Sequence, residues 1–94
     1  MKLYTIASGS SGNCVYVEAA NTHILIDAGV TAKRIEAGLN AAGAGLSDLD
    51  AILVTHEHID HVRGLEVIAK KHVVPIYGTK ETLHEIAKNA RNAD

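Results

Sequence analysis

The chain has 94 residues, which is enough for one small domain. Apolar residues make up 47% and charged residues 21%, a balance that excludes an intrinsically disordered chain. The formal net charge of -2 at pH 7 excludes a strongly basic protein that would hold a polyanion by charge alone, although another segment could still supply a nucleic-acid surface.

The first part of the chain predicts three strands and a helix. Residues 2–7 are apolar and rich in strand-forming types, and they end at the loop-forming sequence of residues 8–13. Residues 14–18 and 23–27 follow with the spacing of a hairpin. Thr31 can cap a helix that extends to about Ala42, before a glycine-rich segment.

The second part of the chain alternates strand and helix. Residues 50–55 form a short continuous apolar run, typical of a strand buried on both faces. Helices are predicted over residues 62–72 and 79–92, and a short strand lies between them at residues 73–77, where Pro75 indicates an edge or a strand start. Strands followed by alternating helices and strands predict an α/β fold built on a layered sheet.

The single cysteine, Cys14, bears on the cellular compartment. One thiol cannot form an intramolecular disulfide, which favours a reducing environment and predicts a cytoplasmic protein. Cys14 lies in an apolar run, so we expect a buried small side chain rather than a reactive thiol or a metal ligand. No signal-peptide pattern is present and the apolar runs are too short to cross a bilayer, so no membrane partner is expected.

The most informative stretch follows the predicted strand at residues 50–55, and it contains His56, His58, Asp60 and His61. Ligand sites of open α/β sheets lie at the carboxyl ends of strands. Alternate residues leaving a strand point the same way, so His56 and His58 can converge on one cation. Asp60 and His61, at the start of the next helix, face a second position, as a two-metal site requires. Imidazole suits zinc, iron or manganese, so the pattern predicts a metal site.

Other ionisable residues are weaker candidates for this site. Glu57 points away from the two histidines beside it and is expected to be solvated or to support the site indirectly. His23 lies inside a hairpin strand, His72 at a helix end and His84 on a helix. We do not expect any of these three to bind the metal.

Three segments together resemble the metallo-β-lactamase superfamily. The stretch from His56 to His61 is similar to the HxHxDH motif of that superfamily, which is specific when it follows an apolar strand ending in threonine. Residues 24–29 resemble the strand-Asp-x-Gly element upstream of that motif. Residues 8–13, together with the spacing, resemble the YycJ-like (WalJ-like) subgroup of bacterial cytoplasmic hydrolases.

The resemblance implies a role for each matching residue. His56 and His58 would ligate a first divalent metal ion, and Asp60 and His61 a second, with zinc expected and manganese or iron as alternatives. Asp60 would also orient the attacking water, which makes it the candidate catalytic residue. Asp27 would brace the metal loop from behind the ligands, and the alternative is an ordinary aspartate in a turn before a glycine.

The same resemblance implies a fold larger than this chain. Members of the superfamily are αβ/βα sandwiches, so residues 1–94 are expected to form a single truncated domain, the N-terminal half, with a mixed sheet and helices on one face. Residues 8–13 would line the site from the facing sheet. Further ligands would come from the other half, so we expect the chain alone to be inactive. The uncovered sheet face, which carries residues 15–17 and 52–54, predicts a homo-oligomer.

Several functions remain open at this point. The resemblance favours a metal-dependent hydrolase, and the subgroup favours a phosphodiesterase or nuclease with DNA or RNA as its substrate. Hydrolysis of thioesters or lactones is an alternative, because the fold does not decide the substrate. A non-catalytic metal-binding or assembly module is another.

Overall fold

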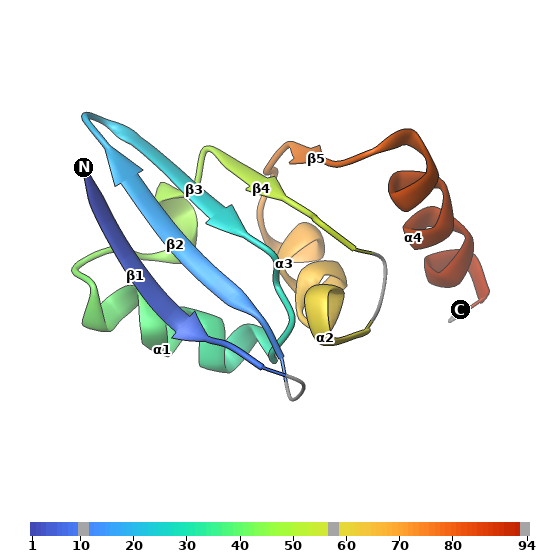
Figure 1. Cartoon of the computed structure of the whole chain (residues 1–94), viewed down its shortest axis with the longest axis horizontal. Helices are drawn as coiled ribbons and strands as arrows, with labels where there is room; N and C mark the ends of the chain where they lie inside the picture. The colour runs from blue at the N-terminus through green and yellow to red at the C-terminus, as the bar shows by residue number, and fades with distance from the viewer. Residues whose placement is uncertain (10–11, 57–58, 93–94) are drawn as a thin grey trace.

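A computed structural model of the chain describes residues 1–9, 12–56 and 59–92, with the backbone alone for residues 59, 60 and 88–92. The elements follow the predicted order, strands first and then alternating helices and strands (Figure 1). The strands are β1 (Lys2–Ala7), β2 (Cys14–Ala19), β3 (Thr22–Ile26), β4 (Ala51–Leu53) and β5 (Ile76–Tyr77). The helices are α1 (Ala32–Ala41), α2 (Ile59–Val62), α3 (Leu65–Lys71) and α4 (Lys80–Asn92), with a 3-10 turn at Leu46–Asp48.

The five strands form one mixed sheet in the order β1-β2-β3-β4-β5. β2 runs antiparallel to both of its neighbours, β1 and β3, whereas β4 runs parallel to β3 and β5 runs parallel to β4. Parallel neighbours need a crossover connection, and α1 connects β3 to β4 while α2 and α3 connect β4 to β5. The carboxyl ends of β3 and β4 therefore lie side by side at one end of the sheet (Figure 1).

One face of the sheet is covered by α1 and α3. Tyr16, Leu25 and Ile52 are neighbours across three strands, and all three side chains are fully buried. The side chains that the two helices add to this core are Ile35, Leu39, Leu65 and Ile68. Helices on one face of a mixed sheet agree with the predicted fold class.

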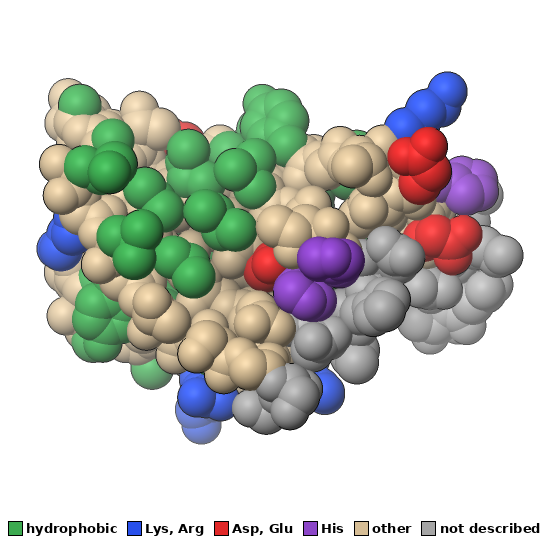
Figure 2. Space-filling view, viewed as in Figure 1, with side chains coloured by type: hydrophobic (Ala, Val, Ile, Leu, Met, Phe, Trp, Pro, Cys, Tyr) green, Lys and Arg blue, Asp and Glu red, His purple; other side chains and the backbone are tan. Residues whose placement is uncertain are grey.

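The opposite face of the sheet is apolar, and we call it the open sheet face. The strand register puts on it the side chains Leu3, Val15, Val17, Ile24, Ile26, Leu53 and Tyr77. Leu3, Leu53 and Tyr77 are exposed, and Figure 2 shows hydrophobic side chains gathered over the strands. The two charged strand residues, Lys2 and Glu18, pair across β1 and β2 on the helix-covered side, so neither lies on the open sheet face.

Three predicted elements differ clearly from the structure, and one of them is the strand predicted over residues 73–77, which covers only Ile76–Tyr77. The predicted helix over residues 62–72 is two short helices, because α2 ends at Val62 and α3 begins at Leu65. Gly64 separates them, and a Cβ added at this position would collide with backbone atoms of residues 30 and 32. The strand predicted over residues 50–55 is shorter and is not buried on both faces, since Leu53 is 37% exposed.

The helix ends agree with the sequence. The Thr31 side chain accepts a hydrogen bond from the backbone N–H of Arg34 at 3.3 Å and so caps α1, as predicted. Thr79 does the same for α4, accepting from the backbone N–H of Thr82 at 3.1 Å. α4 lies beyond β5 at the edge of the sheet (Figure 1). None of the helices in the described part of the chain has the length and apolar character needed to span a membrane.

Candidate metal centre

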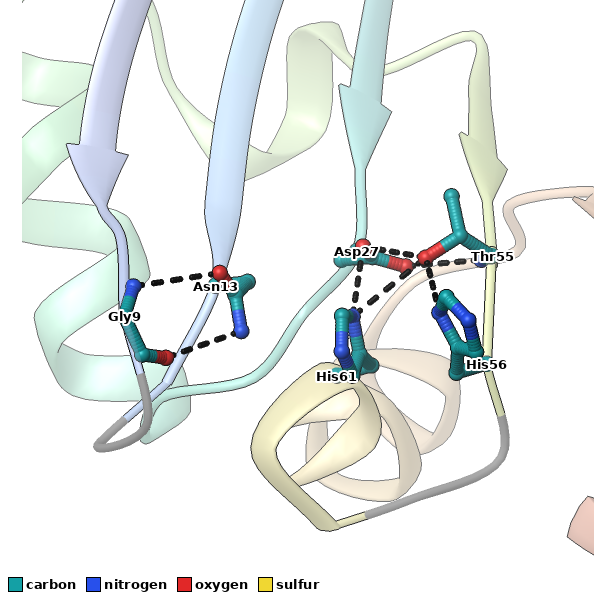
Figure 3. Close-up of polar contacts among 6 residues, drawn as sticks. All are labelled: Gly9, Asn13, Asp27, Thr55, His56 and His61. Carbon is teal, nitrogen blue, oxygen red and sulfur yellow. Dashed lines mark hydrogen bonds and ion pairs between the residues drawn. The ribbon is translucent and has the colours of Figure 1, made fainter.

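Asp27 is the buried acidic residue at the carboxyl end of β3. It is only 5% exposed, and its φ of 65° lies in the left-handed region, which aspartate tolerates better than most residues. Its backbone N–H donates to the carbonyl of Leu53 at 2.7 Å, which fixes it to the neighbouring strand. The Asp27 carboxylate therefore meets the segment that follows β4 (Figure 3).

Thr55 is held by both carboxylate oxygens of Asp27. The Thr55 backbone N–H donates to Oδ1 at 2.8 Å, and its hydroxyl donates to Oδ2 at 2.7 Å. Hydrogen bonds to an ionised acceptor are stronger than those between neutral groups. They fix the residue that comes directly before His56. In the sequence motif, Thr55 is only the last residue of an apolar strand, so the sequence did not predict that Thr55 contacts Asp27. The one signal available was that Thr55 comes directly before His56.

His56 and His61 meet at the Thr55 hydroxyl. Nδ1 of His61 lies 2.8 Å from Oδ2 of Asp27 and 3.3 Å from Oγ1 of Thr55. Nδ1 of His56 lies 3.0 Å from the same Oγ1. The two ring centroids are 4.7 Å apart, and Figure 3 shows both rings turned toward Thr55 and Asp27. We call these four residues the Asp27 cluster.

The Asp27 cluster is buried at its carboxylate end and exposed at its histidine end. The Asp27 side chain is 7% exposed and that of His61 is 19% exposed, while His56 is an exposed residue. Figure 2 shows a pair of histidine side chains together at the surface. Because Nδ1 of each ring is bonded inward, Nε2 is the nitrogen on the outer side of each ring. A carboxylate behind an imidazole orients it for metal binding, so these donors fit a divalent ion such as zinc.

Backbone hydrogen bonds hold α2 against the end of β3. The N–H of Ala28 donates to the carbonyl of His61 at 2.8 Å, and the N–H of Gly64 donates to the carbonyl of Ala28 at 2.7 Å. On the other side, the N–H of Gly29 donates to the carbonyl of Asn13 at 2.8 Å. The segment after β3 thus joins the helix that carries His61 to the loop between β1 and β2.

The loop between β1 and β2 was predicted to line the site from a facing sheet, and this is wrong. β1 and β2 belong to the same sheet as β3 and β4, so the loop lies at the same end of that sheet (Figure 3). The Asn13 amide closes the loop, donating to the carbonyl of Gly9 at 3.0 Å and accepting from its N–H at 3.2 Å. A Cβ at Gly12 would lie 2.6 Å from the carbonyl oxygen of Gly29, so only glycine permits this approach. Residues 10 and 11 lie outside the described residues.

A comparison with protein families matches residues 7–93 to the metallo-beta-lactamase superfamily. This match covers nearly the whole chain. The chain belongs to the metallo-beta-lactamase superfamily. Membership implies that the fold binds divalent metal, in agreement with the donors of the Asp27 cluster.

Relatives within the metallo-beta-lactamase superfamily include two exodeoxyribonucleases. The chain is 44% identical over 77 residues to exodeoxyribonuclease YycJ of Bacillus anthracis, which covers 82% of this chain and 29% of that protein. It is 43% identical over 81 residues to exodeoxyribonuclease WalJ of Streptococcus pneumoniae, covering 86% and 30% respectively. Its fold resembles a metallo-beta-lactamase of Cronobacter sakazakii, with a TM-score of 0.81 and 20% identity over 92% of this chain and 32% of that one. The chain therefore spans about three tenths of the length of these relatives.

Two of the four ligands predicted for the superfamily motif fall outside what the structure describes. They are His58 and the side chain of Asp60, and Glu57 is also outside. The backbone of Asp60 lies in α2, directly before His61. Among the side chains that are described, no three histidines, cysteines or carboxylates gather as metal ligands. The full ligand set therefore stays a prediction.

The remaining histidines occupy other elements. His23 lies near the start of β3, where its Nδ1 is 2.6 Å from the hydroxyl of Tyr16, and that hydroxyl donates to Glu18 at 2.9 Å. His72 follows α3, and its backbone N–H bonds the last turn of that helix. His84 is exposed on α4. None of the three lies in the Asp27 cluster.

Cys14 is buried in the core, as predicted. Burial raises the pKa of its thiol from 9.0 to about 12, with the negative charge of Asp27 as a second cause. A thiol with this pKa stays protonated at neutral pH, and the thiolate is the form that attacks or binds metal. Cys14 is therefore a core side chain rather than a nucleophile.

Proposed function

We propose that this chain carries the first ligands of a two-metal hydrolase site. His56 and His58 would hold one divalent ion, and Asp60 and His61 would hold the second, with zinc as the favoured metal. The observation that carries this proposal is the Asp27 cluster, because a buried carboxylate bonds Nδ1 of one histidine directly and reaches the other through Thr55. Bracing of this kind is what metal-binding histidines require.

The proposed reaction is hydrolysis of a phosphodiester. Divalent metals bound here would supply Lewis acidity, which strengthens water as a nucleophile near neutral pH and stabilises charge on the phosphate. Asp60 would accept a hydrogen bond from the attacking water and so orient it. Asp27 would hold the ring of His61 through Nδ1, at the 2.8 Å distance that the structure gives. The two exodeoxyribonuclease relatives support DNA as the substrate, with RNA as the close alternative.

A hybrid protein tests this proposal. The chain would replace the 77 matched residues of the Bacillus anthracis relative, so that the rest of that protein supplies whatever this chain lacks. We expect the purified hybrid, with zinc or manganese, to degrade labelled DNA from its ends. His56→Ala and Asp60→Ala should abolish this activity. His72→Ala is the matched control and should leave it unchanged.

Other outcomes of the hybrid experiment would favour a different function. A folded hybrid that binds metal and cleaves a thioester or lactone, but neither DNA nor RNA, would contradict the nuclease assignment. A folded hybrid that binds metal and cleaves none of these substrates would favour a non-catalytic module. The 94-residue chain alone should show no turnover above a metal-only control, because four ligands are fewer than the superfamily site needs.

We also propose that a second copy of this chain covers the open sheet face. Leu3 is 63% exposed on this face and Tyr77 is 54% exposed. An apolar sheet face needs a second layer, and two sheets pack face to face at a separation of about 10 Å. The absence of charged strand residues on the open sheet face supports pairing with an identical surface. The assembled form would be a homodimer or a higher oligomer.

A further inference from the structure

The Thr55 hydroxyl has one proton and three close polar neighbours. Its Oγ1 lies 2.7 Å from Oδ2 of Asp27, 3.0 Å from Nδ1 of His56 and 3.3 Å from Nδ1 of His61. An ionised carboxylate only accepts hydrogen bonds. The shortest of the three contacts is the one to the carboxylate, so the hydroxyl proton is committed to Asp27. Thr55 can then only accept from the two imidazoles.

This assignment of protons fixes which nitrogen of each histidine carries hydrogen. To bond an acceptor at 3.0 Å, Nδ1 of His56 must be the N–H nitrogen. Nδ1 of His61 must also carry hydrogen, because it lies 2.8 Å from Oδ2 of Asp27. In the neutral rings, the lone pair is then on Nε2. The two histidines reach this state by different routes, since Nδ1 of His61 contacts the carboxylate itself, whereas Nδ1 of His56 contacts the Thr55 hydroxyl.

The Asp27 carboxylate, which accepts the last of these hydrogen bonds, is itself fixed in place. The second oxygen of Asp27 accepts the backbone N–H of Thr55 at 2.8 Å, and the Asp27 side chain is 7% exposed. Neither the carboxylate nor the hydroxyl can therefore turn to water without breaking these hydrogen bonds. The direction of the hydrogen bonds runs from His56 to Thr55 and from Thr55 to Asp27.

We propose that Thr55 is a positioning residue that sets the tautomer of His56. Because the Thr55 hydroxyl donates its proton to Asp27, it can only accept a hydrogen bond from Nδ1 of His56. Neutral histidine in water favours hydrogen on Nε2, so without this contact most His56 rings would need to move a proton before Nε2 could bind a metal ion. The consequence for metal binding rests on the proposed function, whereas the tautomer itself does not. Supporting residues of this kind typically change metal affinity about 10–100-fold when replaced.

Nitrogen-15 NMR of the metal-free chain tests the proposal directly. Proton–nitrogen correlation spectra, recorded at a pH where the imidazoles are neutral, distinguish Nδ1–H from Nε2–H rings. We expect wild-type His56 and His61 both to be Nδ1–H. In Thr55→Val, which keeps the shape and removes the hydroxyl, His56 should change to mainly Nε2–H while His61 stays Nδ1–H. Thr55→Ser should restore the wild-type spectrum, and Thr5→Val, at an exposed threonine on β1, should leave it unchanged.

The outcomes separate this inference from the proposed function. An Nε2–H His56 in the wild type, or an unchanged His56 in folded Thr55→Val, would overturn it. If Thr55→Val does not fold, the wild-type and Thr55→Ser spectra still decide, because both must show Nδ1–H at His56. Zinc titration of the same samples should show affinity about 10–100-fold weaker in Thr55→Val. If the wild type shows the expected tautomers and binds no zinc, the proposed function fails and the role of Thr55 stands.

Discussion

Asp27 combines a left-handed backbone with three hydrogen bonds to its side chain, and this combination limits what can replace it. The backbone at φ 65° favours asparagine, aspartate or glycine. The side chain must accept from the N–H and hydroxyl of Thr55 and from His61. Asparagine satisfies the first requirement and has one oxygen in place of two. Asp27→Asn therefore tests the loss of the carboxylate in a residue that still tolerates the left-handed backbone.

We predict that Asp27→Asn keeps the fold and weakens zinc binding about 10–100-fold, because an amide NH2 replaces one of the two oxygens that accept from Thr55 and His61. Competition with a chromophoric chelator measures the affinity, and circular dichroism checks the fold. Glu66→Gln is the control, since Glu66 makes an exposed ion pair with Lys70 on α3. Equal zinc affinity in Asp27→Asn and the wild type would contradict the role of the carboxylate.

The buried thiol of Cys14 predicts a loss of stability at alkaline pH. Its pKa is about 12 in the folded chain against 9.0 for an ordinary thiol. Between these values the unfolded chain releases the proton and the folded chain keeps it, so the free energy of unfolding falls as pH rises above about 9. Burial and the hydrogen bond to Glu18 likewise raise the pKa of Tyr16 from 10.0 to about 12, which adds to the fall.

Urea unfolding at about pH 8 and at about pH 10.5 measures this effect. Cys14→Ala should be less stable than the wild type at the lower pH, because it leaves a cavity in the core. It should also lose less stability between the two pH values, since it has no thiol to ionise. An identical pH dependence in the two proteins would show that the Cys14 proton does not contribute.

At the scale of elements, the break between α2 and α3 is the feature that positions His61. A single helix over residues 62–72 was predicted from apolar spacing, which gave no sign of a break. Gly64 lies where a side chain would press on the carbonyl oxygen of Val30 and come within 3.0 Å of the backbone nitrogen of Ala32. This contact joins residues far apart in the chain, so local periodicity could not predict it.

We predict that Gly64→Ala lowers the free energy of unfolding by about 1–3 kcal/mol, in the range of other overpacked sites. The added methyl group meets backbone atoms that cannot turn away. Gly45→Ala is the matched control, because the nearest atom to a Cβ there is an Asp48 side-chain oxygen at 3.8 Å. Denaturant unfolding of the two variants tests the prediction, and equal stabilities would contradict it.

Sequence alone predicted the order of the strands and helices and the Thr31 cap, because these depend on local patterns. The hairpin of β2 and β3, the Thr31 cap and the edge position of β5 are all confirmed. The link from Asp27 to Thr55 and the position of the β1–β2 loop were not predicted correctly. Both depend on which strands become neighbours in the sheet, and the spacing of residues along the chain does not determine that.

At the scale of the whole molecule, the open sheet face is an apolar surface that no helix of the described chain covers. If two copies pair through it, a charge placed on it should separate them, because each copy would bury that charge against its partner. We predict that Leu53→Glu is monomeric at micromolar concentration, whereas the wild type is dimeric or larger. Multi-angle light scattering measures the mass.

The control for this prediction is Val73→Glu, which places the same charge on a fully exposed residue away from the strands. It should behave as the wild type does. A wild-type chain that is monomeric and unfolds cooperatively would refute assembly through the open sheet face. It would also show that residues 1–94 are stable with that face in water.

We propose that His56, His58, Asp60 and His61 bind divalent metal, and the zinc content of the purified chain decides whether this claim holds. The purified chain would be equilibrated with zinc, dialysed and measured by elemental analysis. We predict that the wild type and the control His72→Ala/His84→Ala retain at least equimolar zinc, and that His56→Ala/His58→Ala loses most of it while staying folded. Unchanged zinc content in a folded His56→Ala/His58→Ala chain would contradict the claim.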